Sequence, residues 1–368
     1  MSKRQRIGIF LPTWVGDVVM ATPTLRAVRS GFPDVELVGV MRPVMVELLA
    51  GTSMLDSHLL FEKSKRDGLP TRVGLVSALR AAKLDAMVLL TNSLWSAAAA
   101  KLAGIRRIVG YNRDVRGWLL TERIAVPQVL VPQVAVTGAV GTAGRLAEPP
   151  TIDYYLGLAE HIGCDISDRR SQLAVTPDES RIADDLWRSC QFDLATPTIV
   201  INNNAALEQS RLWPIEKVQE LAKKIAQDGY QVLLHCGPSE RERANQIAAE
   251  VNHPLVASMG QSKDLPIGLT KAVLARAKAV VTTDSGPRHI AVALNRPVIS
   301  LFGPTDPFNT RTYNLSETVL AADLPCRPCR AKACPFKHDQ CMKSLDVQMV
   351  LQAVYKAIHQ PILRANVA

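Results

Sequence analysis

The sequence predicts an α/β protein built from two doubly wound domains, each with a parallel sheet. Three observations lead to this prediction. The chain has 368 residues, which is more than one hydrophobic core usually serves. Short apolar runs alternate with segments of helical period, as expected of βαβ units. Two such series follow one another, and we place the boundary between them near Pro177.

The first domain, residues 1–176, begins with a buried strand at 7–11 and a helix at 17–29 that has apolar residues at helical spacing. Further strands are expected at 36–40, 86–90 and 107–110, and further helices at 45–49 and 152–162. Between Pro127 and Pro150, prolines, glycines and small residues dominate. We expect a long loop there, of the kind that often carries binding function.

The second domain, residues 177–345, repeats this alternation of strands and helices without repeating the sequence. Strands are expected at 198–201, 231–234, 279–282 and 298–301, and helices at 215–227, 240–251, 265–275 and 287–294. A last helix at 346–358 could pack on either domain. Two facing domains of this kind leave a cleft between the carboxyl ends of their strands, where ligands bind. This suggests nucleotide chemistry but does not name an enzyme class.

The composition narrows the range of partners. A net charge of +9 suits phosphates or anionic lipid heads, and an aromatic content of 5% is low for stacking single-stranded nucleic acid, so we expect no nucleic-acid partner. No apolar stretch reaches the roughly 20 residues of a spanning helix, and the apolar run at 7–11 is too short for a signal peptide. We expect a cytoplasmic protein, with no prediction of its oligomeric state.

Asp17 and Gly16 lie where the first strand turns into a helix. Gly16 allows a tight turn and close backbone approach. Asp is a favoured helix cap, so spacing alone favours a capping role for Asp17. The alternative is a carboxylate presented to a ligand.

A second strand-to-helix turn carries the run TDSGPRH, residues 283–289. Pro287 suits the first position of a helix. The free amides at such a helix start form an anion pocket, where Ser285 and Gly286 could approach a diphosphate. An ordinary turn fits the pattern equally well. The chain has no G-x-G-x-x-G run, so a dinucleotide site has no fingerprint.

Two charged residues of the second domain are further candidates. Arg211, in the run QSRLWP, could bind a phosphate through two N–H groups, or be an ordinary surface residue. Glu240, after the run CGPS, could accept hydrogen bonds from ribose hydroxyls, or simply favour its own helix start.

Four cysteines lie close together as C-x₂-C-x₄-C-x₆-C. They are Cys326, Cys329, Cys334 and Cys341, with His338 between the last two. In a cytoplasmic protein this spacing favours a metal knuckle over disulfides. A structural zinc is one hypothesis, an iron–sulfur site is another, and a loop of reduced thiols is the third.

Four segments together resemble glycosyltransferase family 9, which contains the ADP-heptose:lipopolysaccharide heptosyltransferases. They read TWVGDVVMATPTLRAVR, SRLWP, TTDSGPRHIAVALNRPVISLFGPTDP and CRPCRAKACPFKHDQCM, and they run from Thr13 to Met342. The match is closer to the heptosyltransferase II type. The chain departs from many family members at residues 202–204, which are all asparagine where those proteins have Pro-Gly.

The resemblance implies a GT-B fold whose second domain holds the nucleotide sugar and whose final segment, 346–368, crosses back to the first domain. It implies these site residues: Asp17 as catalytic base; Arg211, Glu240, Asp284, Ser285, Gly286 and His289 on the donor; and Thr13, Arg113 and Arg116 on the acceptor. Arg113 and Arg116 stand in the run GYNRDVRGWLL, which is similar to a basic segment of heptosyltransferase II.

The implied reaction is an inverting transfer of heptose from ADP-heptose to an anionic lipopolysaccharide inner core or related glycolipid at the inner face of the cytoplasmic membrane. Asp17 would be a weak base near a helix N-terminus, so its position would matter more than its basicity. No metal or other cofactor is required if Arg211 and the helix end neutralise the diphosphate, and no D-x-D triplet is present. Three alternatives are a transferase for another nucleotide sugar and glycan, a two-domain nucleotide-sugar epimerase, and a non-catalytic scaffold.

Overall fold

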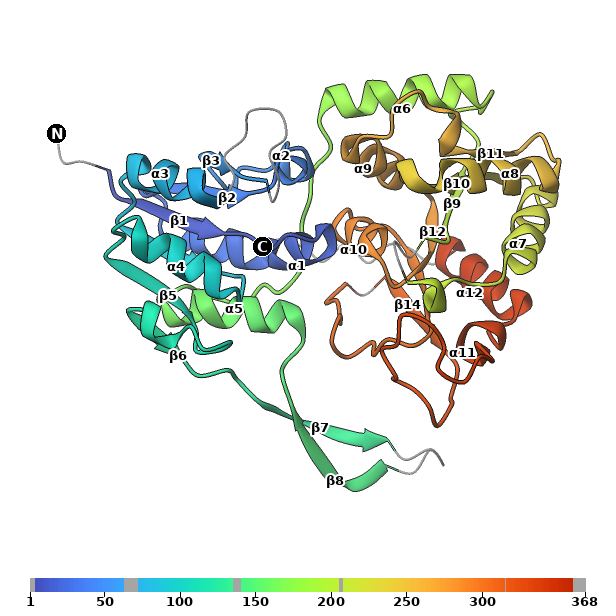
Figure 1. Cartoon of the computed structure of the whole chain (residues 1–368). Coiled ribbons are helices and arrows are strands. Elements are labelled where there is room, and N and C mark those ends of the chain that lie inside the picture. The colour runs from blue at the N-terminus through green and yellow to red at the C-terminus, as the bar shows by residue number, and fades with distance from the viewer. Residues whose placement is uncertain (1–3, 63–71, 135–139, 205–207, 315, 360–368) are drawn as a thin grey trace. The chain divides into compact units, whose positions relative to one another are not determined.

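The computed structural model describes residues 4–62, 72–134, 140–204, 208–314 and 316–359 (Figure 1). The chain forms two compact units. Unit 1 holds the described residues up to Leu173 together with Asn309–Arg311, and unit 2 holds the others from Ala174 onward. The boundary lies three residues before the expected one. Asn309 is tied to unit 1 because its carbonyl accepts hydrogen bonds from the Thr151 amide at 2.9 Å and hydroxyl at 3.0 Å.

Unit 1 is a six-stranded parallel sheet covered by helices. Its strand order is β3-β2-β1-β4-β5-β6. The strands are β1 (Arg6–Phe10), β2 (Glu36–Met41), β3 (Ser57–Leu60), β4 (Ala86–Leu89), β5 (Arg107–Tyr111) and β6 (Glu122–Ile124). The helices are α1 (Val15–Gly31), α2 (Pro43–Leu49), α3 (Arg72–Ala82), α4 (Leu94–Leu102) and α5 (Thr151–His161).

Unit 2 repeats the same order with β11-β10-β9-β12-β13-β14, again parallel throughout. The strands are β9 (Thr198–Asn202), β10 (Gln231–His235), β11 (Val256–Ser258), β12 (Ala279–Thr283), β13 (Val298–Phe302) and β14 (Glu317–Ala321). The helices are α6 (Pro177–Ser189), α7 (Ile215–Gln227), α8 (Arg241–Val251), α9 (Ile267–Arg276), α10 (Gly286–Ala293), α11 (Gln340–Lys343) and α12 (Val347–His359). The predicted fold class, two doubly wound parallel sheets, is confirmed.

The central strands are buried because helices cover both faces of each sheet. Every residue of β4, β9, β10, β12 and β13 is buried, which explains why these strands read as continuous apolar runs rather than alternating ones. In both sheets the strand order reverses beside the first strand of the unit, between β1 and β4 and between β9 and β12. Ligands of doubly wound sheets bind at this switch point, outside the carboxyl ends of the strands.

The expected loop at 127–150 is largely an antiparallel hairpin. It is formed by β7 (Val129–Val134) and β8 (Val140–Ala147), which pair with each other and with no other described strand (Figure 1). Leu130 is 70% exposed and Leu146 is 66% exposed. The prediction of a loop was wrong here because the prolines and glycines of this segment obscure the alternation of apolar and polar residues that marks a strand. Residues 135–139, which are part of this expected loop, lie outside the described residues.

Helix α12 packs on unit 2. Its buried side chains include Val350, Leu351 and Val354, and it contacts α7, β12 and β13. This differs from the expectation that the final segment crosses back to the first domain; residues 360–368 lie outside the described residues. Among the described helices, none is long and apolar enough to cross a membrane.

Candidate active site

The switch point of unit 1 opens into a cavity of about 350 Å³. Thr13, Trp14 and Asp17 follow β1 and line one side, while Thr91 and Asn92 follow β4 and line the other. Further lining residues come from the start of α5 and the segment before it, namely Glu148, Pro149, Thr151, Tyr154 and Tyr155. The cavity therefore lies where a doubly wound sheet is expected to bind its ligand.

Asp17 is one of two acids that line this cavity, the other being Glu148. The N-cap of α1 is Trp14, so Asp17 lies inside the first turn and does not cap the helix. Burial raises the pKa of Asp17 from 3.8 to about 6. A carboxylate at a helix N-terminus was expected to be a weak base, but removal from water disfavours the charged form and makes this carboxylate more basic. A carboxylate with a pKa near 6 is suited to accept a proton at neutral pH.

Thr13 and Trp14 form the edge of the cavity beside Asp17. Thr13 is half-buried, and Trp14 is 68% exposed although it is a large apolar side chain. An exposed indole at the mouth of a cavity offers a flat face and an N–H donor to a ligand.

Arg116 does not present its charge to a ligand, in contrast to the sequence prediction. Its side chain is fully buried, at 0% exposure. The guanidinium donates to the carbonyl oxygens of Tyr111, at 3.0 Å, and Thr91, and to Oδ1 of Asn92, at 3.0 Å. Arg116 therefore holds two residues of the cavity wall in place. Its sequence neighbour Arg113 is partly exposed and forms an ion pair of 2.6 Å with Glu148, which lines the cavity.

The second predicted site is the start of α10 in unit 2. Ser285 is its N-cap, Gly286 is the first helical residue, and Pro287 occupies the first turn. Ser285 and Gly286 are half-buried, so their amides remain near the surface of a helix N-terminus. Asn202 at the end of β9 donates to the hydroxyl of Ser285 at 2.9 Å. The asparagine that departs from the Pro-Gly pattern thus ties β9 to this loop.

Arg211 lies against the same loop. It ends a short 3₁₀ turn (Gln209–Arg211), and its Nη1 donates to the backbone oxygen of Asp284 at 2.7 Å. Its charge is partly balanced by Glu208, at 2.5 Å. The structure therefore brings Arg211 and the start of α10 together, as the sequence prediction requires, although they are more than 70 residues apart.

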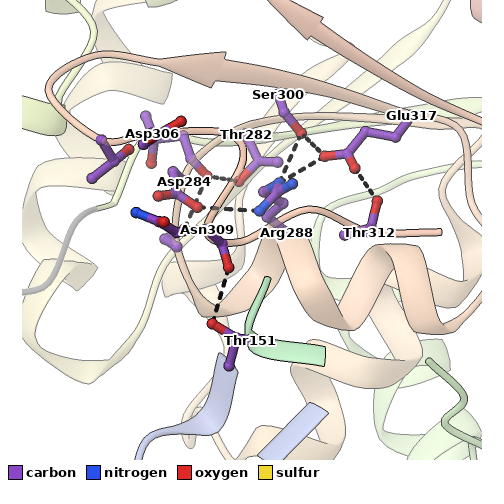
Figure 2. A network of polar contacts seen from close by, with 12 residues as sticks. Thr151, Thr282, Asp284, Arg288, Ser300, Asp306, Asn309, Thr312 and Glu317 are labelled. Atoms are coloured by element: carbon purple, nitrogen blue, oxygen red, sulfur yellow. Dashed lines mark hydrogen bonds and ion pairs between the residues drawn. The ribbon is translucent and has the colours of Figure 1, made fainter. Parts of the chain in front are cut away.

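Asp284 is held in a buried ionic network rather than presented to solvent (Figure 2). Nη1 of Arg288 donates to its Oδ1 at 3.2 Å, and Nε of Arg288 donates to Oε1 of Glu317 at 2.7 Å. The guanidinium also lies over the ring of Phe302. Burial would raise the pKa of Glu317, but Arg288 and the hydroxyl donors Ser300 and Thr312 lower it overall. Arg288, which was not among the predicted site residues, fixes the carboxylate of Asp284.

His289 is buried behind that network. Burial, together with the charge of Arg288, lowers its pKa to about 3. The imidazole is therefore neutral at physiological pH and supplies no cation to a diphosphate.

Glu240 lines a separate cavity of unit 2, of about 400 Å³. Arg243, Glu208, Asn203 and Asn204 line the same cavity. One oxygen of the Glu240 carboxylate accepts from the backbone amide of Gly237 at 3.2 Å. Glu240 thus supports its own helix start and also faces a cavity, and Glu208 links that cavity to Arg211.

The four-cysteine cluster gives no support to the zinc hypothesis. All four thiols are free, with Cys341 buried and Cys329 exposed. Among the described residues, no group of three or more His, Cys, Asp or Glu side chains is arranged to hold a metal ion. Sequence spacing placed these residues near one another but did not determine the direction of their thiols.

Comparison with known proteins agrees with this architecture. The family model for glycosyltransferase family 9 (heptosyltransferase) matches residues 72–339. Lipopolysaccharide heptosyltransferase 2 of Escherichia coli K12 is 27% identical over 315 residues, covering 82% of this chain and 84% of that protein.

Two solved structures share the fold over nearly the whole chain. A glycosyl transferase family 9 protein from Veillonella parvula DSM 2008 has a TM-score of 0.79 at 19% identity, covering 96% of this chain and 97% of that one. The E. coli ADP-heptose lipopolysaccharide heptosyltransferase II has a TM-score of 0.74 at 23% identity, covering 96% and 98%. The fold is GT-B, and the chain belongs to glycosyltransferase family 9.

Proposed function

We propose that this protein transfers a heptose from ADP-heptose to an anionic lipopolysaccharide inner-core acceptor, with inversion at the anomeric carbon. The observation that carries the proposal is Asp17, a carboxylate with a pKa raised to about 6 in the switch-point cavity of unit 1. Family membership and the likeness to lipopolysaccharide heptosyltransferase 2 support the choice of donor and acceptor.

The donor is bound by unit 2. The amides of Ser285 and Gly286, at the positive end of α10, receive the diphosphate, and Arg211 approaches it from the adjoining turn. Glu240 accepts hydrogen bonds from the ribose in the neighbouring cavity. Asp284 acts through Arg288 to keep the loop in place and does not touch the phosphates, because two negative groups repel.

The acceptor is bound in the cavity of unit 1, with Thr13 beside Asp17. The acceptor hydroxyl attacks the anomeric carbon and forms the new glycosidic bond, while its proton passes to Asp17. The bond between that carbon and the distal phosphate oxygen breaks, and ADP leaves with the electron pair. Arg211 and the α10 amides stabilise the charge that develops on ADP, so no step in this scheme uses a metal.

A second part of the proposal concerns location. The acceptor is a glycolipid, and the net charge of +9 suits an enzyme that meets an anionic leaflet at the inner face of the cytoplasmic membrane. Co-sedimentation with vesicles containing anionic lipid, compared with neutral vesicles, tests this directly. Equal recovery with both kinds of vesicle contradicts it.

The first experiment is titration of the protein with ADP, UDP and GDP by calorimetry. Selective binding of ADP that Arg211→Ala weakens supports the ADP-linked donor and its placement in unit 2. Tighter binding of UDP or GDP keeps the GT-B mechanism but replaces the donor. Turnover with ADP-heptose then separates transfer from epimerisation, because an epimerase converts the free donor without an acceptor.

A further inference from the structure

Asn92 is a polar residue of the Asp17 cavity to which the family resemblance assigns no role. It lies three residues beyond β4, on the other side of the switch point from Asp17. Its side chain is half-buried and lines the cavity together with Asp17 and Tyr154. A ligand that fills this cavity can reach both the carboxylate and the amide.

Two donors determine how the amide of Asn92 is oriented. Nη2 of Arg116 donates to its Oδ1 at 3.0 Å, and the hydroxyl of Tyr154 donates to the same oxygen at 3.1 Å. A guanidinium has only N–H donors, so the atom that faces it must be the oxygen of the amide. The nitrogen Nδ2 therefore lies on the opposite side, and within the described part of the chain it has no hydrogen-bond partner.

Arg116 and Tyr154, the two residues that orient Asn92, are each suited to act as a lasting donor. Arg116 is fully buried and, among the described residues, forms no salt bridge; three of its five N–H groups donate to oxygen acceptors instead. Burial raises the pKa of Tyr154, so its hydroxyl keeps the proton that it donates. Burying a charged group costs free energy, which these hydrogen bonds and the charge of Asp114 partly offset. Because Arg116 donates to both Thr91 and Asn92, its hydrogen bonds hold this part of the cavity wall in one arrangement.

We propose that Asn92 binds the acceptor saccharide, its Nδ2 donating to a sugar oxygen next to the hydroxyl that Asp17 deprotonates, with Arg116 and Tyr154 as positioning residues. The inference rests on the proposed function, in which this cavity holds the acceptor. The two N–H groups of Asn92 Nδ2, held in one orientation, favour oxygen acceptors on the ligand. They also fix the rotation of the sugar, which decides which hydroxyl reaches Asp17.

Asn92→Asp is the sharpest test because it keeps an oxygen for Arg116 and Tyr154 while replacing the donor group with a second acceptor. The assay uses ADP-heptose and lipopolysaccharide purified from a strain lacking heptosyltransferase 2, at pH 8, so that Asp17 stays ionised. We expect the acceptor KM to rise about 10- to 100-fold, as for loss of one well-placed hydrogen bond, with the ADP-heptose KM unchanged. An unchanged acceptor KM overturns the proposal.

A double-mutant cycle tests the positioning role of Tyr154. Tyr154→Phe removes one donor to the Asn92 oxygen, and we expect it to raise the acceptor KM about 3- to 10-fold in the parent protein. In the Asn92→Ala background the same change has nothing left to orient, so we expect no further effect. Equal effects in the two backgrounds refute the idea that Tyr154 acts through Asn92.

A binding measurement separates this inference from the proposed function. The delipidated core saccharide is titrated into Asp17→Asn protein, with and without Asn92→Asp, and tryptophan fluorescence is followed because Trp14 lines the cavity. Weaker binding in the double variant supports the role of Asn92 even if Asp17→Asn retains turnover, which would refute only the assignment of the base. Equal affinity in both proteins, including no binding in either, overturns the inference.

Discussion

Replacing Asp17 with asparagine is expected to stabilise the protein while abolishing transfer. The pKa of Asp17 is about 6 in the folded chain and 3.8 when unperturbed. This difference corresponds to up to about 3 kcal/mol of destabilisation at neutral pH, because the buried carboxylate is charged there. Asparagine has the same shape and no charge. Asp17→Asn should therefore gain up to about 3 kcal/mol at pH 8, a gain often found when a functional charge is removed.

The sign of this effect depends on pH. Because the folded pKa lies above the unfolded one, the protonated acid contributes stability that is fully present below about pH 3.8 and is lost as the pH rises through about 6. The advantage of Asp17→Asn should thus fall below about 1 kcal/mol at pH 4. Other acids titrate equally in both proteins and cancel in the comparison.

Urea unfolding followed by circular dichroism at pH 8 and pH 4 measures this difference. Heptose transfer by the parent protein should in parallel increase with pH through about 6, as the base loses its proton. An Asp17→Asn variant that is no more stable than the parent at pH 8 would refute the burial argument. Loss of ADP binding together with turnover would instead show that Asp17 has a structural role.

Three further outcomes are expected in unit 2. Arg211→Ala should weaken ADP binding about 10- to 100-fold in calorimetry, because a charged hydrogen-bond donor to the diphosphate is lost; unchanged affinity would exclude Arg211 from the donor site. Arg288→Met should lower stability by about 3–5 kcal/mol in thermal unfolding, since Glu317 keeps a buried charge without its cation. A smaller loss in the presence of Glu317→Gln would confirm that cause. The imidazole of His289 should show no NMR titration between pH 5 and 8, because its pKa is about 3; a midpoint near 6.5 would contradict its burial. Transfer should also persist in EDTA, and loss of activity that added magnesium restores would reveal a metal step.

Strong periodicity made most of the fold predictable. Helix α7 was expected at 215–227 and occupies Ile215–Gln227, because its apolar residues recur on one face that is buried. Helix α6 was missed, although Thr176 and Glu179 form a capping box on either side of Pro177 that the sequence displays. Strand β14 was missed because it is an edge strand with little burial.

The sequence indicated the candidate site residues that stand in short local motifs. It did not indicate the residues whose role depends on contacts with distant parts of the chain. Asp17 and the turn at Ser285 stand in local patterns that mark a strand-to-helix junction. The burial of Arg116 depends on carbonyl groups of Tyr111 and Thr91, which no sequence pattern identifies. Asn92 was detectable in principle, as a polar residue after a buried strand, but only the strand order shows that β4 lies beside β1.

The repeated strand order has a consequence for how such enzymes diversify. Each unit carries its own complete sheet and its own switch point. Under the proposed assignment of the acceptor to unit 1 and the nucleotide to unit 2, substitutions after β1 and β4 can alter which saccharide is glycosylated without changing the residues after β9 and β12. The acceptor specificity and the donor specificity would then be encoded in separate stretches of one gene and could change at different rates. Recombination between related genes near residue 174 would exchange one specificity while preserving the other.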